Sequence, residues 1–143
     1  MRNATVAVAE SCTGGLLAER ITSIGGSSRY FLGGAVVYSN ALKTELAGVP
    51  ADMIERHGAI SREVAAALAE GIRYRCDSTF GVGITGVAGP GGGSPEKPVG
   101  LVFHAIASDS GTEVVQRNFL GDRKRIRRFA STMALDMLRK NLM

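Results

Sequence analysis

The sequence has 143 residues, a formal net charge of +4 at pH 7, 45% hydrophobic residues and 21% charged residues. These values are typical of a globular chain and exclude a disordered or fibrous protein. No apolar run reaches the roughly 18 residues that a membrane span needs, and the start MRNATVAV lacks a signal-peptide pattern. We therefore expect one domain, residues 1–143, in a soluble cytoplasmic protein that does not contact a membrane.

The first half of the sequence alternates between strand and helix patterns. In chain order we predict a strand over 5–9, a helix over 13–24, a strand over 34–38, and three helices over 41–47, 50–56 and 62–75. Gly25 and Gly26 are expected to end the first helix. Ser39 or Asn40 is expected to cap the second helix, and Ser61 the last of these three.

The second half favours a strand, a glycine-rich loop, a hairpin and a final helix. The strand and loop are predicted over 79–85 and 86–98, and the hairpin over 99–107 and 113–120. Asp122 is the expected cap of the final helix, whose apolar stripe is Ile126, Phe129, Met133 and Met137. This order implies an α/β fold, a three-layer α/β/α domain with a mixed central sheet, mostly parallel plus an antiparallel hairpin.

Polar residues follow three of the predicted strands. They occupy residues 10–13, 38–40 and 85–89, and Lys43 comes one turn into the helix after the second strand. Because open α/β sheets bind ligands beyond the carboxyl ends of their strands, these residues converge if the strands are neighbours. The functional site is therefore expected at this edge of the sheet.

Ser11 and Cys12 lie just before a predicted helix, whose unpaired N–H groups favour an anion or a nucleophile. The simpler alternative is that Ser11 or Thr13 only caps this helix. A serine nucleophile needs a base, and neither His57 nor His104 comes with an obvious orienting carboxylate.

Lys43 is the better candidate for the base, provided that burial lowers its pKa towards neutrality. A solvated helix lysine is the alternative for Lys43, and a residue at the edge of the core is the alternative for Tyr38.

The glycine-rich loop over 86–100 does not match a nucleoside-triphosphate loop. It is either a flexible surface loop or a place where a glycine backbone approaches a ligand closely. The basic run GDRKRIRR opens the final helix, where Arg123 or Arg127 and the helix N-terminus suit a phosphate. A solvated basic face is the alternative, and a nucleic-acid surface is disfavoured because the charge is confined to one turn.

Cys12 and Cys76 are expected to be thiols, because a lone disulfide does not fit a chain without an export signal. No His, Cys or carboxylate cluster has metal-ligand spacing in the sequence. We therefore expect neither a metal nor a cofactor.

Five separated motifs, in this order, resemble the CinA C-terminal domain family, also known as the nicotinamide mononucleotide deamidase family. They are AESCTGG, VVYSNALK, HGAIS, GITGVAGPGGG with KPVG, and FLGDRKRIRR. The resemblance runs from about Thr5 to the C-terminus. Family members usually carry a helix before the first strand, whereas this sequence begins almost at that strand.

The resemblance implies hydrolysis of the carboxamide of nicotinamide mononucleotide, which gives nicotinic acid mononucleotide and ammonia without a metal. The family's site residues match Ser11 as nucleophile, Tyr38 and Lys43 in support, Thr85, and Arg123, with Arg125 or Arg127 as alternatives to Arg123. The expected partners are a small-molecule mononucleotide and further copies of the chain in a homo-oligomer.

On this assignment Ser11 attacks the amide carbon and Lys43 takes its proton. The expected substrate-binding residues are Thr13, Gly14 and Gly15, whose N–H groups hold the oxyanion, together with Thr85, Gly86, Gly89, Arg123 and Arg127. One alternative makes Cys12 the nucleophile, because a helix N-terminus lowers a thiol pKa. Another is a non-catalytic nucleotide-binding domain, or an interaction domain associated with DNA uptake or DNA damage.

Overall fold

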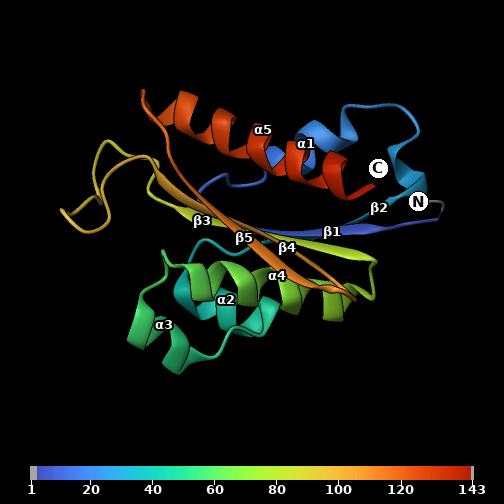
Figure 1. Cartoon of the computed structure of the whole chain (residues 1–143), viewed down its shortest axis with the longest axis horizontal. Helices are drawn as coiled ribbons and strands as arrows, with labels where there is room; N and C mark the ends of the chain where they lie inside the picture. The colour runs from blue at the N-terminus through green and yellow to red at the C-terminus, as the bar shows by residue number, and fades with distance from the viewer. Residues whose placement is uncertain (1–2, 143) are drawn as a thin grey trace.

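A computed structural model describes residues 3–142, and Figure 1 shows a central sheet between two layers of helices. The strands are β1 (Val6–Glu10), β2 (Phe31–Val36), β3 (Phe80–Gly86), β4 (Leu101–Ser108) and β5 (Gly111–Asn118). The helices are α1 (Leu16–Thr22), the 3-10 helix η1 (Ser27–Arg29), α2 (Asn40–Ala47), α3 (Ala51–His57), α4 (Arg62–Cys76) and α5 (Arg123–Leu142). Within the described residues, no helix is long and apolar enough to cross a membrane.

The five strands lie in the order β2-β1-β3-β4-β5. β1 pairs with β2 and β3 in parallel, whereas β4 is antiparallel to both β3 and β5. Helices α1 and α5 cover one face of the sheet, and α2, α3 and α4 cover the other (Figure 1). The predicted α/β fold with a mixed sheet and an antiparallel hairpin is therefore confirmed.

The strand order creates a ligand crevice beside β1. The chain leaves β1 towards β2 on one side, and β3 lies on the other side. Helices that connect such strands diverge to opposite faces, which leaves a crevice at the carboxyl ends of the strands. The loop between β3 and β4 returns at the same end of the sheet and projects beyond it (Figure 1).

Helix α4 lies very close to β3 because β3 carries glycines where the two elements cross. A Cβ atom added at Gly83 would lie 2.5 Å from the carbonyl oxygen of Ala65, and one at Gly81 would overlap the carbonyl oxygen of Ala69. This close packing is possible because residues of α4 that face β3 include Ala65 and Ala69. The same contacts fix the position of α4 along β3.

Three predicted helix caps are present. The side chains of Ser39, Ser61 and Asp122 each accept a hydrogen bond from the backbone N–H three residues on, at 3.1, 3.2 and 2.9 Å. These bonds satisfy N–H groups that a helix leaves unpaired at its start. Ser39, rather than Asn40, is therefore the cap of α2.

Two predicted boundaries are wrong, and backbone geometry explains both. Gly14 and Gly15 adopt φ angles of 59° and 105°, so the first helix begins at Leu16 instead of residue 13. Such left-handed backbone cannot continue an α-helix, and glycine adopts it at little cost. β2 starts earlier than the predicted 34–38 because its pairing with β1 begins at Phe31, opposite Val6.

The predicted apolar stripe of α5 is partly wrong. Ile126 and Met137 are buried, but the Phe129 side chain is 43% exposed. Fully buried Ala130 and Ala134 lie against the sheet instead. Small side chains at these positions let the helix approach the sheet closely, and the larger phenyl ring is displaced to the edge of the interface.

His104 is completely buried in the middle of β4. Its ring packs edge to face against Phe119, with ring centroids 5.9 Å apart. Burial lowers the pKa of His104 to about 4, because it outweighs the carbonyl oxygens of Val115 and Ala130, which favour the protonated ring. The imidazole is therefore neutral in the folded protein at physiological pH.

We predict that His104 makes the protein less stable in mild acid. Between pH 6.5 and pH 4 the unfolded chain binds a proton at this residue and the folded chain does not, so stability falls as pH falls. The free energy of unfolding, measured with urea, should be roughly 1 kcal/mol lower at pH 5.5 than at pH 7.5. His104→Leu should lose this difference; an unchanged pH dependence in the variant would contradict the prediction.

Candidate functional site

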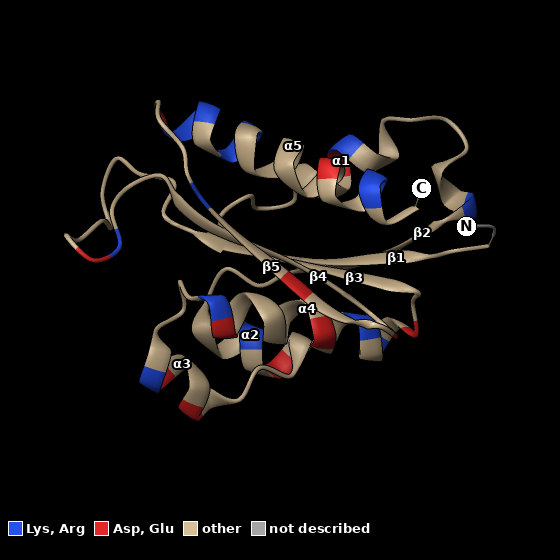
Figure 2. Cartoon of the chain, viewed as in Figure 1, with Lys and Arg blue, Asp and Glu red and all other residues tan. Residues whose placement is uncertain are grey.

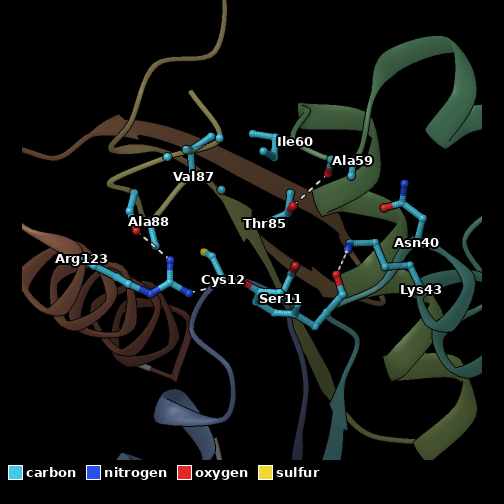
Figure 3. A pocket seen from close by; sticks show the side chains of 15 residues that line it. Ser11, Cys12, Asn40, Lys43, Ala59, Ile60, Thr85, Val87, Ala88 and Arg123 are labelled. Carbon is cyan, nitrogen blue, oxygen red and sulfur yellow. Dashed lines mark hydrogen bonds between the residues drawn. The ribbon is translucent and has the colours of Figure 1, made fainter. Parts of the chain in front are cut away.

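A pocket of about 220 Å³ opens at the carboxyl ends of β1, β2 and β3. Figure 3 shows Ser11, Lys43, Thr85 and Arg123 approaching it from different elements. The three polar strand ends therefore converge on one pocket, as predicted. The residues that line the pocket are Ser11, Cys12, Tyr38, Asn40, Lys43, Ala59, Ile60, Thr85, Gly86, Val87, Ala88, Gly89, Gly91, Gly92 and Arg123.

Ser11 is the first residue after β1, and its backbone continues the sheet. Its N–H donates to the carbonyl oxygen of Ile84 in β3 at 3.0 Å, and its own carbonyl oxygen accepts from Gly14 N–H at 3.0 Å. The second bond closes a tight turn before α1. The Ser11 side chain is 7% exposed and lies on the pocket wall (Figure 3).

Glu10 is a residue to which the sequence analysis gave no role. Its carboxylate is 1% exposed and accepts three hydrogen bonds, from Thr13 Oγ1 at 2.6 Å and from the N–H groups of Leu17 and Ala18 at 2.9 Å each. The carboxylate thus caps α1 from the strand side, because the cap residue Gly15 makes no side-chain bond. A carboxylate near an uncapped helix start is the signal that would have identified it.

Lys43 lies one turn into α2 with its side chain 2% exposed. Its Nζ donates to the carbonyl oxygen of Tyr38 at 3.1 Å and points towards the pocket, on the same side as the Ser11 hydroxyl (Figure 3). Burial lowers the pKa of Lys43, because it removes the ammonium group from water. A neutral amine, which can accept a proton, is therefore more accessible at this residue than at a surface lysine.

Cys12 lies beside Ser11 with its sulfur on the pocket wall (Figure 3). Burial raises the pKa of the thiol to about 12, and the charge of Glu10 adds to this effect. These contributions outweigh the nearby cations Arg127 and Lys43, which favour the thiolate. Because only the thiolate is a good nucleophile, this environment disfavours Cys12 as the attacking group at neutral pH.

Arg123, the first residue of α5, reaches across the pocket mouth. Its guanidinium donates to the carbonyl oxygen of Gly89 at 2.7 Å and to the phenol oxygen of Tyr38 at 3.2 Å. Figure 2 shows Lys and Arg gathered at the start of α5, near the loop that follows β3. The helix N-terminus and Arg123 therefore face the same end of the pocket.

Thr85 and Gly86 end β3 on the wall opposite Arg123. The Thr85 hydroxyl donates to the carbonyl oxygen of Ala59 at 2.8 Å, which joins β3 to the segment before α4. Ala59 and Ile60 belong to the HGAIS motif and line the pocket, although no site role was predicted for them. Asn40, Val87 and Ala88, which fall in the ranges 38–40 and 85–89 expected at the site, also line it.

Four predicted substrate-binding residues do not line the pocket. Of the predicted oxyanion donors, Gly14 N–H is bound to the Ser11 carbonyl instead, and the hydroxyl of Thr13 is bound to Glu10. Arg127 donates through Nε to the carbonyl oxygen of Cys12 at 3.2 Å and through a terminal nitrogen to that of Thr13 at 2.7 Å. Gly15 is the N-cap residue of α1 and has left-handed backbone. These residues build the turn that carries Ser11.

The fold and the pocket define a three-layer α/β protein with a polar site at its topological switch point. A sequence model described as the CinA C-terminal domain matches residues 1–142. The chain belongs to the CinA C-terminal domain family.

The relatives support this assignment at high identity. A CinA-like protein of Koribacter versatilis (strain Ellin345) is 65% identical over 142 residues, 99% of this chain and 34% of the relative. A CinA-like protein of Acidobacterium capsulatum is 62% identical over 143 residues, 100% of this chain and again 34% of the relative. The chain thus spans about a third of the length of these curated relatives.

Solved structures show the same fold. A competence/damage inducible protein from Agrobacterium tumefaciens is 41% identical with a TM-score of 0.93, and the match covers 99% of this chain and 87% of that one. A CinA superfamily protein from Escherichia coli is 31% identical with a TM-score of 0.91, over 95% of this chain and 79% of that one.

We predict that removing the buried amine of Lys43 stabilises the folded protein. The pKa of Lys43 is lower in the folded chain than in the unfolded chain, so the unfolded chain holds the proton more tightly, and each unit of difference costs about 1.4 kcal/mol at neutral pH. Lys43→Met should therefore raise the free energy of unfolding at pH 7. Wild-type stability should rise between pH 7 and 10.

Urea denaturation of Lys43→Met and of the exposed control Lys124→Met measures this difference. The control should stay within about 0.5 kcal/mol of wild type. A Lys43→Met protein less stable than the control would mean that the ammonium group is stabilised where it lies.

Proposed function

We propose that this pocket hydrolyses the carboxamide of nicotinamide mononucleotide to nicotinic acid mononucleotide and ammonia. The proposal rests on one observation: Ser11 and the buried Lys43 line the same pocket. Burial lowers the pKa of Lys43. A serine beside an unprotonated lysine is one of the established arrangements for acyl transfer. The family resemblance supplies the substrate, and the chemistry of the pocket is consistent with it.

In the first half-reaction, Ser11 Oγ forms a bond to the amide carbon while Lys43 Nζ takes the hydroxyl proton. The tetrahedral intermediate carries its negative charge on the former amide oxygen. Lys43 then gives the proton to the leaving nitrogen, the carbon–nitrogen bond breaks, and ammonia departs. The product of this step is an ester between Ser11 and the pyridine carboxyl group.

In the second half-reaction, water attacks the ester carbon and Lys43 again accepts a proton. Collapse of the intermediate breaks the bond to Ser11 Oγ, and the proton returns to the serine. The carboxylic acid product gives its remaining proton to solvent or ammonia and leaves as the carboxylate. Lys43 thus acts as base and acid in both halves, so the Lys43→Met protein, although more stable, is expected not to turn over.

The charge of the pocket favours an anionic substrate. Among the described residues that line it, Arg123 is a permanent cation and none is acidic. Arg123 stands at the mouth, beside the N-terminus of α5 and the glycine loop, which is where a phosphate group would be bound. The amide end of the substrate then extends inward to Ser11.

Tyr38 supports both ends of this arrangement. Its carbonyl oxygen accepts from Lys43 Nζ, and its phenol oxygen accepts from Arg123. The phenol is 62% exposed, so its proposed role is to hold Arg123 over the pocket mouth rather than to transfer a proton.

The second candidate function is a non-catalytic one. Lys124, Arg125 and Arg128 are exposed on the first turns of α5, so they are free to meet a nucleic-acid phosphate chain. Such a role is compatible with the name of the solved relative from Agrobacterium tumefaciens, a competence/damage inducible protein. Nucleotide binding without ammonia release, or DNA affinity that falls steeply with salt, would favour this candidate.

Ser11→Ala and Cys12→Ala test the nucleophile. Ser11→Ala should lower ammonia release from nicotinamide mononucleotide by at least about 1,000-fold, because it removes the attacking atom. Cys12→Ala should keep most of the activity, since the thiol is held neutral. Steady-state assays of ammonia release at pH 7.5 measure both effects. An active Ser11→Ala protein together with an inactive, folded Cys12→Ala protein would reject Ser11 as the nucleophile.

Arg123→Met tests phosphate recognition. It should raise the KM for the mononucleotide by at least about 10-fold with little change in kcat, because an interaction with a charged group distant from the reacting bond is lost. Arg125→Met, two residues further along α5 and outside the pocket lining, is the matched control. Nicotinamide riboside, which lacks the phosphate, should be hydrolysed equally by wild type and Arg123→Met, and a loss there would show that Arg123 serves another part of the substrate.

A further inference from the structure

We propose that Glu10 is a positioning residue, whose carboxylate holds the turn that carries Ser11 and thereby sets the reactivity of the Ser11 hydroxyl. The inference rests on the proposed function for the assignment of Ser11 as nucleophile. Glu10 itself does not line the pocket. It acts through the backbone that follows Ser11.

The three hydrogen bonds of Glu10 connect the two sides of Ser11. Glu10 is the last residue of β1, directly before the serine. Its partners come after the serine: Thr13 Oγ1 in the turn, and the N–H groups of Leu17 and Ala18 in the first turn of α1. The carboxylate therefore closes a small loop of chain around Ser11.

Among residues 3–142, no other side chain caps this end of α1. Gly15 occupies the cap position, and Gly14 and Gly15 both have left-handed backbone. Without Glu10, two backbone N–H groups and one hydroxyl would lose their acceptor, and each buried unpaired donor costs free energy. The turn keeps its present shape because the carboxylate satisfies all three.

Three other polar groups of the turn are bound by other elements. Ser11 N–H is bound to Ile84 in β3, and Arg127 of α5 binds the carbonyl oxygens of Cys12 and Thr13. Strand, helix and Glu10 thus fix the turn from three directions. A displacement of about 1 Å at a reacting atom can cost on the order of 100-fold in rate, so the Glu10 contacts are expected to matter for kcat.

The test measures Ser11 reactivity without an amide substrate. A fluorophosphonate forms a bond from Ser11 Oγ to phosphorus, releases fluoride, and leaves the serine proton on the neighbouring base. Intact-protein mass spectrometry follows the labelling rate, and Ser11→Ala identifies the labelled residue. The variants are Glu10→Gln, Thr13→Val and Thr13→Ser.

Glu10→Gln should slow labelling at least about 100-fold, since an amide presents one acceptor oxygen to three donors. Thr13→Val should slow it by a smaller factor, and Thr13→Ser, which keeps the hydroxyl, should label close to the wild-type rate. With nicotinamide mononucleotide, Glu10→Gln should lower kcat with the KM within about 3-fold. Ile21→Val, a buried α1 change away from the turn, is the control for stability loss and should label at the wild-type rate.

A folded Glu10→Gln protein that labels at the wild-type rate overturns the proposal. So does an Ile21→Val protein slowed as much as Glu10→Gln, because the effect would then reflect stability alone. If Glu10→Gln does not fold, the Thr13→Val and Thr13→Ser pair decides in the same way.

Labelling of wild type without any hydrolysis of the mononucleotide, slowed in Glu10→Gln, supports the positioning role and rejects the substrate. Absence of labelling in wild type overturns both the activated serine and the role of Glu10.

Discussion

The hydrogen bonds on both sides of β1 at its carboxyl end are the constraint on which the site depends. Ser11 N–H is bound to Ile84 of β3, and the carbonyl oxygen of Glu10 accepts from Val37 N–H, just after β2, at 2.8 Å. Because both neighbours run parallel to β1, the three polar strand ends must emerge together. This pairing brings Lys43 and Thr85, from segments far apart in the sequence, to the same pocket as Ser11.

The site contains two buried charged side chains whose surroundings differ. Glu10 is surrounded by donors, with two backbone N–H groups, one hydroxyl and the start of α1. For Lys43, a single carbonyl acceptor is present among the described residues. Three hydrogen bonds fix the Glu10 carboxylate in place, whereas a poorly paired buried amine tends to lose its proton. Glu10 therefore serves the structure of the turn, and Lys43 is suited to exchange a proton.

The sequence was sufficient for the order of elements, three caps and the convergence of the site, because these depend on local patterns and on strand direction. It was not sufficient for Glu10 or Arg127. The acceptor role of Glu10 appears only once Gly14 and Gly15 move the helix start to Leu16. The partners of Arg127 lie 115 and 114 residues away at Cys12 and Thr13, and no spacing rule connects them.

Two arginines in the basic run at the start of α5 make different contacts. Arg123 and Arg127 are four positions apart and therefore on one face of the helix. Arg123 occupies the first turn and faces Gly89 at the pocket mouth, while Arg127, one turn on, lies over the Ser11 turn. The same helix thus contacts both the proposed phosphate end of the site and the turn that carries Ser11, the proposed nucleophile. How α5 docks on the sheet consequently sets the separation between these two ends, and with it the length of substrate that the pocket accepts.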